Sequence, residues 1–509
     1  MYYREPTERA NKLITVSAGL VIVIFLTQLV MFSSTDIVLI RQGVAYLHDD
    51  WRPALDILCA VMLGAEYVFI LLCVFSVRVR GMAAKLLCAF LTWIIVTRVL
   101  CGDPTLVESV EYVRVAALCV ALLCFSMTLE KKERRRMLGA LAAIICVYYL
   151  VIAFLTLAVA VTRENIQLPL GIGITIKEEA GFSFVTVVGR HRNTASMWSV
   201  IGLCLAAYLF SLTKNKLPRV ICVIASIVFY AAVSISRSRL SMLALSVAVS
   251  MFVMLPVLKK LSGKKTAVRI AAALLTALII IPLSYKSYDA VAAVISRANV
   301  LVQSQDQPQY EASTGAEVNE IGTETKPQTE ENAQLAENGD AQNNIDMFKE
   351  TRDADNAKNL GGRVRLWKSV YGTLYFERDR LLRGSLTNDY MYTVNMLSGF
   401  SDPADGELNT HNFFLETLML TGLPGLLLIL AFIFILVCRM LRIFFDAGVD
   451  SSIKLLTLPL TAALLKNMGE AMLLRYDDIT NYMFFLVAGV FLAYSYELLP
   501  EKKLHLRKT

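Results

Sequence analysis

The sequence predicts an all-α polytopic membrane protein, and three observations lead there: its composition, its apolar segments and the placement of its positive charges. Of the 509 residues, 56% are hydrophobic and only 18% are charged. The mean hydropathy is +0.54. A soluble multidomain chain of this length would carry far more polar residues, so that class is excluded.

About twelve apolar segments are long enough, or nearly so, to cross a bilayer. The hydrocarbon core is about 30 Å thick and takes roughly 20 helical residues. Helices satisfy their own backbone hydrogen bonds inside lipid, so each segment is interpreted as a helix. The predicted spans are 13–33, 53–76, 86–100, 113–129, 138–161, 195–212, 220–235, 240–258, 270–284, 411–438, 455–474 and 481–498.

Lysine and arginine concentrate in alternate loops. "EKKERRRM" and "KKLSGKKTAVR" are strongly basic, whereas "CGDPTLVESVEY" and "RYDDIT" are poor in positive charge. Cytoplasmic loops of membrane proteins carry an excess of Lys and Arg. Twelve transmembrane helices with both termini cytoplasmic fit this pattern. The net charge of +7 is therefore attributed to topology, and no nucleic-acid partner is expected.

This topology divides the chain into four parts. The first nine helices and the last three are separated by one long extracytoplasmic loop, and a basic cytoplasmic tail follows. The predicted boundaries are 1–284, 285–409, 410–498 and 499–509.

The long loop has two unlike parts. Residues 303–358 are acidic and nearly free of large apolar side chains, which predicts a disordered insertion. Residues 361–382, "GGRVRLWKSVYGTLYFERDRLL", have apolar side chains at helical spacing. They predict an amphipathic helix that lies on the membrane surface or on the ends of the transmembrane helices. Its predicted apolar face consists of Val364, Trp367, Val370, Tyr371, Leu374 and Tyr375.

Arginines gather at positions predicted to face outward, where the positive-inside rule disfavours them. A solvated turn, a helix cap or lipid contact explains each one singly. Positive charge is unfavourable on this side of the membrane, so two or more arginines there favour a role in binding an anionic ligand. A phosphate bound at a helix N-terminus is such a ligand. These residues are Arg190 and Arg192 in "VVGRHRN", Arg237 and Arg239 in "SISRSRL", and Arg363 and Arg365 in "GGRVRLW".

A histidine, His411, precedes Asn412 at the outer mouth of the tenth span, in "ELNTHNFFLETLML". A boundary residue without chemistry is one interpretation. The other is a general base, because the unperturbed pKa of imidazole suits proton transfer near neutral pH.

Other ionisable residues give weaker signals. Asp49 and Asp50 in "HDDW" could bind a divalent cation, as could the acidic residues of "DPADGE" at 402–407, although turn chemistry explains the latter. Lys466 and Glu470, four apart in the eleventh span, are interpreted as an intrahelical ion pair. Glu66 in the second span has no partner that the sequence identifies. No cysteine or histidine metal motif, P-loop or dinucleotide motif is present, so no metal or cofactor is expected.

Three motifs together resemble the O-antigen ligase and polymerase superfamily of bacterial envelope enzymes. They are "SRSRLSMLAL" at 236–245, "GGRVRLWKSVYGTL" at 361–374 and "THNFFLETLMLTGLPGLLLIL" at 410–430. The order and hydropathy of the segments extend the resemblance over roughly 139–498. The resemblance implies a multi-pass protein of the bacterial cell membrane. Such enzymes transfer a glycan from an undecaprenyl-diphosphate-linked oligosaccharide to an acceptor hydroxyl on the outer face, without metal or nucleotide.

Site residues follow from the resemblance position by position. The family's arginine after the seventh span falls on Arg239, with Arg237 a close second, the loop arginine on Arg363, and the histidine on His411. Gly422 and Gly425 also match. The chain departs at "LLRGSLTNDY", where Gly384 stands alone instead of a Gly-x-Gly. The expected catalytic residues are His411, Arg239 and Arg363, and the expected substrate-binding residues are Arg237, Arg190, Arg192, Arg365 and Asn412.

Expected partners are the lipid-linked donor, a glycan or lipid-linked acceptor, and membrane lipids. The motifs do not separate a ligase, which transfers a finished glycan, from a polymerase, which joins repeat units. Two other functions stay open: a metal-dependent membrane glycosyltransferase that uses Asp49 and Asp50, and a lipid-linked oligosaccharide flippase or transporter. Ionisable residues gathered at the outer face argue against a carrier, whose polar sites lie at the midplane.

Overall fold

The computed structural model describes most of the helical chain. The described residues are 8–33, 52–77, 79–101, 106–162, 164–168, 172–179, 182–187, 192–236, 238–305, 363–364, 366–375, 378–385, 390–398, 410–470, 473–474 and 479–499. The predicted disordered insertion falls almost wholly outside these ranges, as do Asp49, Asp50 and the acidic residues of 402–407. Most of the predicted C-terminal tail lies outside them as well.

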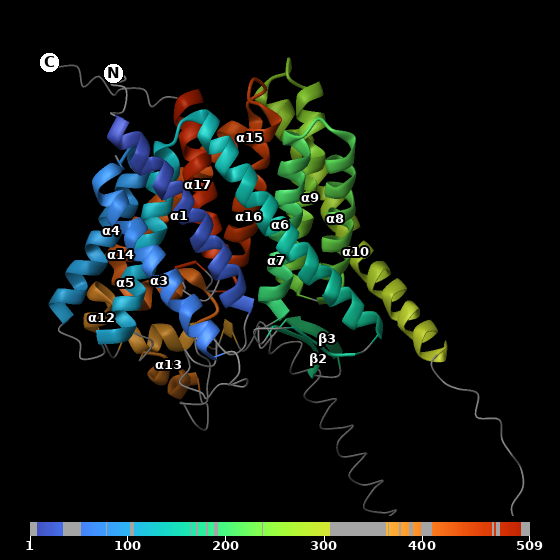
Figure 1. Ribbon diagram of the computed structural model, residues 1–509, viewed down its shortest axis with the longest axis horizontal. Helices are drawn as coiled ribbons and strands as arrows, with labels where there is room; N and C mark the ends of the chain where they lie inside the picture. Colours follow the sequence, from blue (N-terminus) through green and yellow to red (C-terminus); the bar gives the residue numbers. More distant parts are fainter. Residues whose placement is uncertain are drawn as a thin grey trace, which may run out of the picture.

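Ten helices in the described part of the chain are long and apolar enough to cross a membrane. Each coincides with a predicted span, which confirms a multi-pass helical membrane protein (Figure 1). They are α1 (Glu8–Ser33), α3 (Arg52–Ser76), α5 (Leu106–Thr128), α6 (Lys131–Thr162), α7 (Arg192–Leu212), α8 (Lys216–Ser236), α9 (Arg239–Lys260), α10 (Thr266–Gln305), α14 (Phe413–Phe445) and α17 (Ile479–Leu498).

Two predicted spans take other forms, so a count of twelve stays a prediction. Helix α4 (Gly81–Cys101) has a shorter apolar stretch, Gly81–Thr97. The predicted span 455–474 is broken into α15 (Ser451–Leu455) and α16 (Thr457–Asn467), and a turn follows at 468–470. Helix α10 continues well past the predicted boundary at 284.

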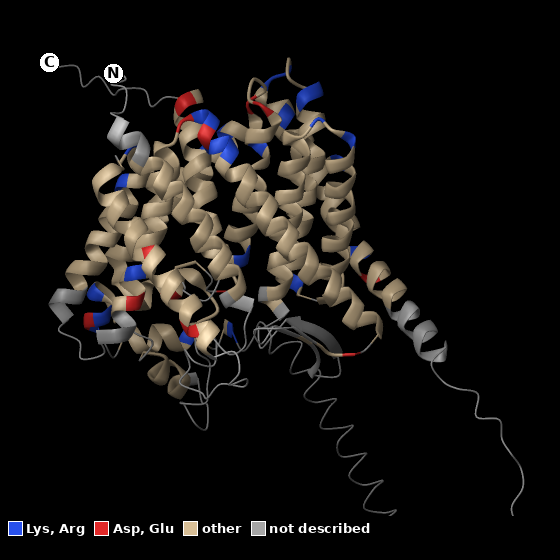
Figure 2. Cartoon of the chain, in the orientation of Figure 1, with Lys and Arg blue, Asp and Glu red and all other residues tan. Residues whose placement is uncertain are grey.

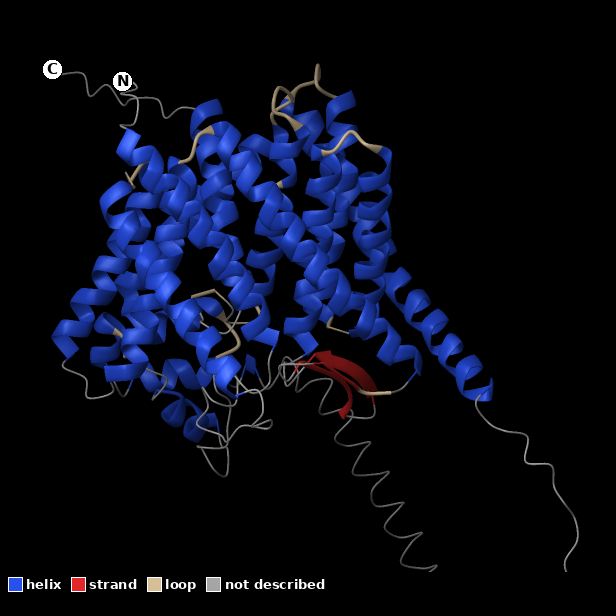
Figure 3. Ribbon diagram, viewed as in Figure 1, coloured by secondary structure: helices blue, strands red, loops and turns tan. Residues whose placement is uncertain are grey.

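A small antiparallel sheet lies between α6 and α7, which an all-α chain does not contain (Figure 3). Its strands are β1 (Ile166–Leu168), β2 (Ile172–Glu179) and β3 (Phe182–Val187), in the order β1-β2-β3. The register places Ile174 opposite Val187 and Ile176 opposite Val185. Both β2 and β3 are rich in β-branched residues, a composition that favours strands, but each strand is too short to stand out beside the long apolar helices.

The two ends of the bundle differ in charge. The start of α1 and the end of α17 lie at the same end, where Lys and Arg also gather in the loops (Figures 1 and 2). The sheet and the short helices α12 (Arg378–Arg383) and α13 (Tyr390–Ser398) lie at the opposite end. By the positive-inside rule the first end is predicted to be cytoplasmic and the second to face outward.

The loop helix, residues 366–375, packs onto the N-terminal part of α14. Its buried side chains Leu366, Val370 and Leu374 form one apolar cluster with residues of α13 and with Leu418, Met419 and Leu420 of α14. Only part of the predicted apolar face is buried against the protein. Tyr371 and Tyr375 are 63% and 68% exposed, because the helix buries the neighbouring stripe that contains Leu366, Ser369 and Thr373.

Helix α14 has a sharp break at Gly422. Its φ of 70° lies in the left-handed region that favours glycine, and Pro424 follows two residues later. Gly384, at the end of α12, has the same φ of 70°. A Cβ at either glycine would overlap the backbone of the other segment, and Ser385 N donates to the Met419 carbonyl at 2.9 Å. The two glycines let α12 sit in the break of α14.

The buried carboxylate of Glu66 has partners after all. Gln28 Nε2 donates to Glu66 Oε1 at 2.6 Å, and the Arg114 guanidinium forms an ion pair with Oε2. Glu66 is fully buried and the Arg114 side chain is 5% exposed. These contacts join α1, α3 and α5, which the sequence could not reveal because the three residues lie in separate spans.

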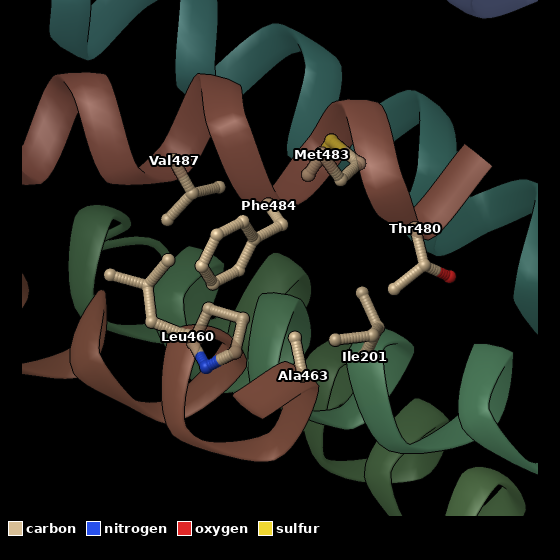
Figure 4. A pocket seen from close by; sticks show the side chains of 8 residues that line it. Ile201, Leu460, Ala463, Thr480, Met483, Phe484 and Val487 are labelled. Atoms are coloured by element: carbon tan, nitrogen blue, oxygen red, sulfur yellow. The ribbon is translucent and has the colours of Figure 1, made fainter. Parts of the chain in front are cut away.

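One apolar cavity lies within the bundle, between α7, α16 and α17 (Figure 4). No ionisable residue lines it, and Thr480 is the one polar lining residue. This cavity therefore offers no chemistry for a charged substrate. Its lining consists of Ile201, Pro459, Leu460, Ala463, Thr480, Met483, Phe484 and Val487.

Candidate functional site

His411 lies just before the start of α14 in a strained backbone conformation. Its φ is 50°, a value that residues other than glycine rarely adopt, and such strain costs of order 1 kcal/mol or more. The next residue, Asn412, is the N-cap of α14 and accepts from the backbone N–H groups of Phe414 and Leu415 at 3.0 and 3.1 Å. The cap fixes where the helix begins and places the imidazole just outside it.

Thr410, the residue before the histidine, is held from two directions. Glu416, in the first turn of α14, accepts from Thr410 N at 3.1 Å and from Thr410 Oγ1 at 2.9 Å. On the other side, Trp367 Nε1 of the loop helix donates to the Thr410 carbonyl at 2.9 Å. Because all of these groups lie near the histidine, they position it relative to both the loop helix and α14.

Glu470 is the centre of the site. Its Oε2 lies 3.0 Å from His411 Nδ1, and its Oε1 accepts from Arg363 Nη2 at 2.9 Å and from Asn193 Nδ2 at 2.6 Å. The side chains of Glu470, His411 and Arg363 are 12%, 20% and 28% exposed. One carboxylate thus joins α7, the start of the loop helix and the mouth of α14, and the histidine next to it stays within reach of solvent.

The pKa of Glu470 is governed by opposing effects. Burial by itself would raise it, but the hydrogen bond and charge of His411, together with the charges of Lys466 and Arg363, lower the pKa to about 2. The carboxylate therefore stays ionised at physiological pH and supplies a fixed negative charge beside the imidazole.

Two further hydrogen bonds hold the turn at 468–470. Arg363 Nη1 donates to the Gly469 carbonyl at 2.7 Å, and Asn412 Nδ2 donates to the Met468 carbonyl at 3.1 Å. A Cβ on Gly469 would come within 3.3 Å of the Arg363 guanidinium and closer still to Leu240. Glycine at this position lets the arginine reach the backbone.

The predicted intrahelical pair of Lys466 and Glu470 is corrected by this geometry. Helix α16 ends at Asn467, so Glu470 lies in the turn beyond it. Lys466 is fully buried and donates instead to the Asn193 carbonyl at 2.5 Å and to Ser241 Oγ at 3.2 Å. Its charge still acts on Glu470, but the carboxylate binds Arg363, Asn193 and His411 directly.

A buried polar network connects Glu470 to the start of α9. The Asn193 side chain donates to Glu470 and accepts from Ser238 Oγ at 2.7 Å. Ser238 is the N-cap of α9 and also contacts Ser241 Oγ at 3.0 Å. Because Arg239 immediately follows Ser238, this network sets its backbone relative to His411, and the Arg239 side chain is exposed.

The predicted site residues thus divide into two groups. The structure brings Arg363, His411 and Asn412 together and places Arg239 at the end of a connected network. Arg190, Arg237 and Arg365 lie outside the described residues, and for Arg192 only the backbone at the start of α7 is described. No group of three or more His, Cys, Asp or Glu side chains suited to a metal ion occurs among the residues that are described.

Sequence reasoning missed the roles of Glu470, Asn193, Ser238 and Lys466. Signals existed for two of them, because the charges of Lys466 and Glu470 stand out within an apolar segment. Because Lys466 and Glu470 are four residues apart, their spacing predicted a pair with each other and not with residues far away in the sequence.

This arrangement can move a proton. When His411 Nδ1–H donates to Glu470, Nε2 carries the lone pair that accepts a proton from a bound hydroxyl. The carboxylate then stabilises the imidazolium that forms, as the acid of a catalytic triad does. Exposed and half-exposed guanidinium groups nearby suit a phosphate-containing substrate.

Comparison with known proteins points to one family. We found no curated protein that matches the chain. Residues 220–430 match the family model described as O-antigen ligase, a stretch that includes Arg239, Arg363, His411 and Asn412. Enzymes of this kind carry out glycan transfer at a membrane. This match supports the resemblance of the chain to the O-antigen ligase and polymerase superfamily over residues 220–430.

Proposed function

We propose that the protein transfers a glycan from an undecaprenyl-diphosphate-linked donor to an acceptor hydroxyl on the outer face of the bacterial cell membrane. The reaction is a single inverting displacement that uses no metal ion. The observation that carries the proposal is the contact of His411 with Glu470 beside Arg363.

The acceptor hydroxyl needs a base because it is a weak nucleophile with a high pKa. In the proposed step the acceptor oxygen bonds to the anomeric carbon as the bond from that carbon to the phosphate oxygen breaks. The hydroxyl proton passes to His411 Nε2, and the bonding electrons leave with the lipid diphosphate. One displacement inverts the anomeric centre.

The leaving diphosphate gains negative charge, which guanidinium groups stabilise at a partly dehydrated membrane face. Arg239 is the foremost candidate, because its exposed side chain starts from the capped N-terminus of α9, where backbone N–H groups also favour an anion. Arg363 is committed to Glu470 and Gly469. Its part is to position the carboxylate and to add positive potential. Arg190, Arg192, Arg237 and Arg365 remain proposed as further phosphate ligands, and Asn412 as a substrate contact.

The decisive test is an assay of purified protein with a lipid-diphosphate oligosaccharide, in which new glycosidic bonds are detected by mass spectrometry. We expect product in the presence of a chelator and its loss in Arg239→Gln. The matched control is Arg219→Gln, which removes an exposed arginine from the opposite end of the bundle, at the start of α8. A ladder of products from donor alone identifies a polymerase, and a requirement for a separate acceptor identifies a ligase. Inhibition by chelator, or full activity of Arg239→Gln, overturns the proposal.

A further inference from the structure

The outward face of the loop helix and α12 has the composition of a membrane-interface surface. Tyr371 and Tyr375 are 63% and 68% exposed, and Leu382 of α12 is 64% exposed. Beside them, Arg378 lies over the Tyr375 ring at 5.5 Å and Arg383 is exposed. Tyrosine bodies, leucine and arginine together are typical of the boundary between hydrocarbon and headgroups.

The depth of α12 supports the same conclusion. Gly384 and Gly422 interlock α12 with the break in α14, and the Thr421 carbonyl beside that break accepts from Trp93 Nε1 of α4 at 2.8 Å. Trp93 lies eight residues before the end of α4 at Cys101, or roughly 12 Å along the helix. Helix α12 therefore sits level with the last turns of a membrane helix, at the margin of the bundle (Figure 1).

Charge complementarity selects the occupant of this surface. Helix α12 carries Arg378, Arg380 and Arg383 against a single acid, Asp379, which pairs with Arg383 at 3.5 Å. Exposed positive charge at headgroup depth attracts anionic lipid by about 1 kcal/mol for each Lys or Arg. Water or the polar surface of a soluble protein would solvate the arginines but would leave the exposed leucine and tyrosines without an apolar partner.

We propose that the tyrosine and arginine surface formed by Tyr371, Tyr375, Leu382, Arg378 and Arg383 docks on the lipid leaflet and binds the phosphate headgroups of anionic phospholipids. The part of this surface on α12 is separate from the His411 site, since the first nine residues of α14, roughly 14 Å along the helix, lie between them. Bound lipid would hold α12 in the break of α14 and thereby the loop helix that contacts Thr410.

Photocrosslinking in nanodiscs of phosphatidylcholine and phosphatidylglycerol tests this proposal in the full-length protein. A benzoylphenylalanine replaces Leu382, and the crosslinked lipids are identified by mass spectrometry. The matched control places the same group at Leu278, which is 71% exposed within the apolar span Thr266–Ile295 of α10. We expect phosphatidylglycerol enrichment over its bulk fraction by about threefold at 382 and none at 278.

Replacing Arg378, Arg380 and Arg383 by Gln is expected to return the adducts at 382 to the bulk lipid ratio. Adducts at 278 stay as before, and they also report that the variant is inserted and folded. An absence of lipid adducts at 382, or an enrichment that persists without the arginines, overturns the proposal. Neither result depends on glycan transfer, so the outcome is independent of the proposed function.

Discussion

The carboxylates of Glu66 and Glu470 each pair with an arginine, and they lie in opposite surroundings. Glu66 is fully buried among membrane helices, with Arg114 and Gln28 as partners. Glu470 lies in a turn, and two of its partners, His411 and Arg363, are 20% and 28% exposed. A sealed ion pair serves packing, because no substrate reaches it. A pair that ends in a reachable histidine can serve chemistry.

The largest expected effect is the loss of the proton acceptor. His411→Gln keeps a polar side chain at the helix mouth but cannot take up a proton, so kcat is expected to fall roughly 10²- to 10⁴-fold. Thermal unfolding should change little, since the side chain is partly exposed. The distinction between the two carboxylates is contradicted if the variant keeps its kcat, or if its loss of activity is explained by a loss of folded protein.

The buried pair is expected to show the reverse pattern. Glu66→Ala leaves the Arg114 charge buried without its carboxylate, which should cost about 3–5 kcal/mol of stability. Denaturation in detergent measures the loss, and activity per folded molecule should stay unchanged. Asp379→Ala is the matched control, because its pair with Arg383 is exposed and worth about 1 kcal/mol or less. Equal effects of the two variants would contradict the distinction.

Glu470→Gln tests the role of the Glu470 charge, because glutamine keeps the shape of the side chain and removes the negative charge. The imidazole loses the group that fixes its orientation and stabilises its protonated form, so kcat/KM should fall about 100-fold. The acid limb of the pH–rate profile should also move to lower pH. A role in folding alone predicts reduced stability with no movement of that limb, and this readout distinguishes the two.

The smallest expected effect is the dependence of stability on acid. The folded-state pKa of Glu470, about 2, is below its ordinary value of 4.5. Its stabilisation is therefore complete above about pH 5 and is lost as the pH falls towards 2. We expect a contribution of about 2 kcal/mol, since water reaches part of the carboxylate. Denaturation of the wild type from pH 6 to 3 measures it, and Glu470→Gln should show a shallower slope.

Most of the membrane architecture follows from sequence because hydropathy is a local property. A run of apolar residues is apolar wherever its neighbours lie, so the ten confirmed spans were predictable. The position of His411 was also predictable from local sequence, since the next residue, Asn412, caps the helix that starts directly after it. The sheet escaped prediction because its short alternating strands were outweighed by the helical signal on either side.

The face that the loop helix buries was not a local property. Spacing predicted one apolar stripe, and contact with Leu418, Met419 and Leu420 decided that Leu366 turns inward while Tyr371 and Tyr375 stay exposed. The partners of Glu66 were likewise set by the packing of three separate helices.

Sequence alone determined that this chain is a multi-pass membrane protein with arginines and a histidine at helix ends, together with the motifs of a glycan-transfer family. Tertiary structure decided what those residues touch. Glu470 follows His411 by 59 residues, and only the end of α16 at Asn467 places its carboxylate in a turn where residues of other elements bind it. Ion pairs depend on distances of a few ångströms, and folding alone sets such distances between residues that lie far apart along the chain.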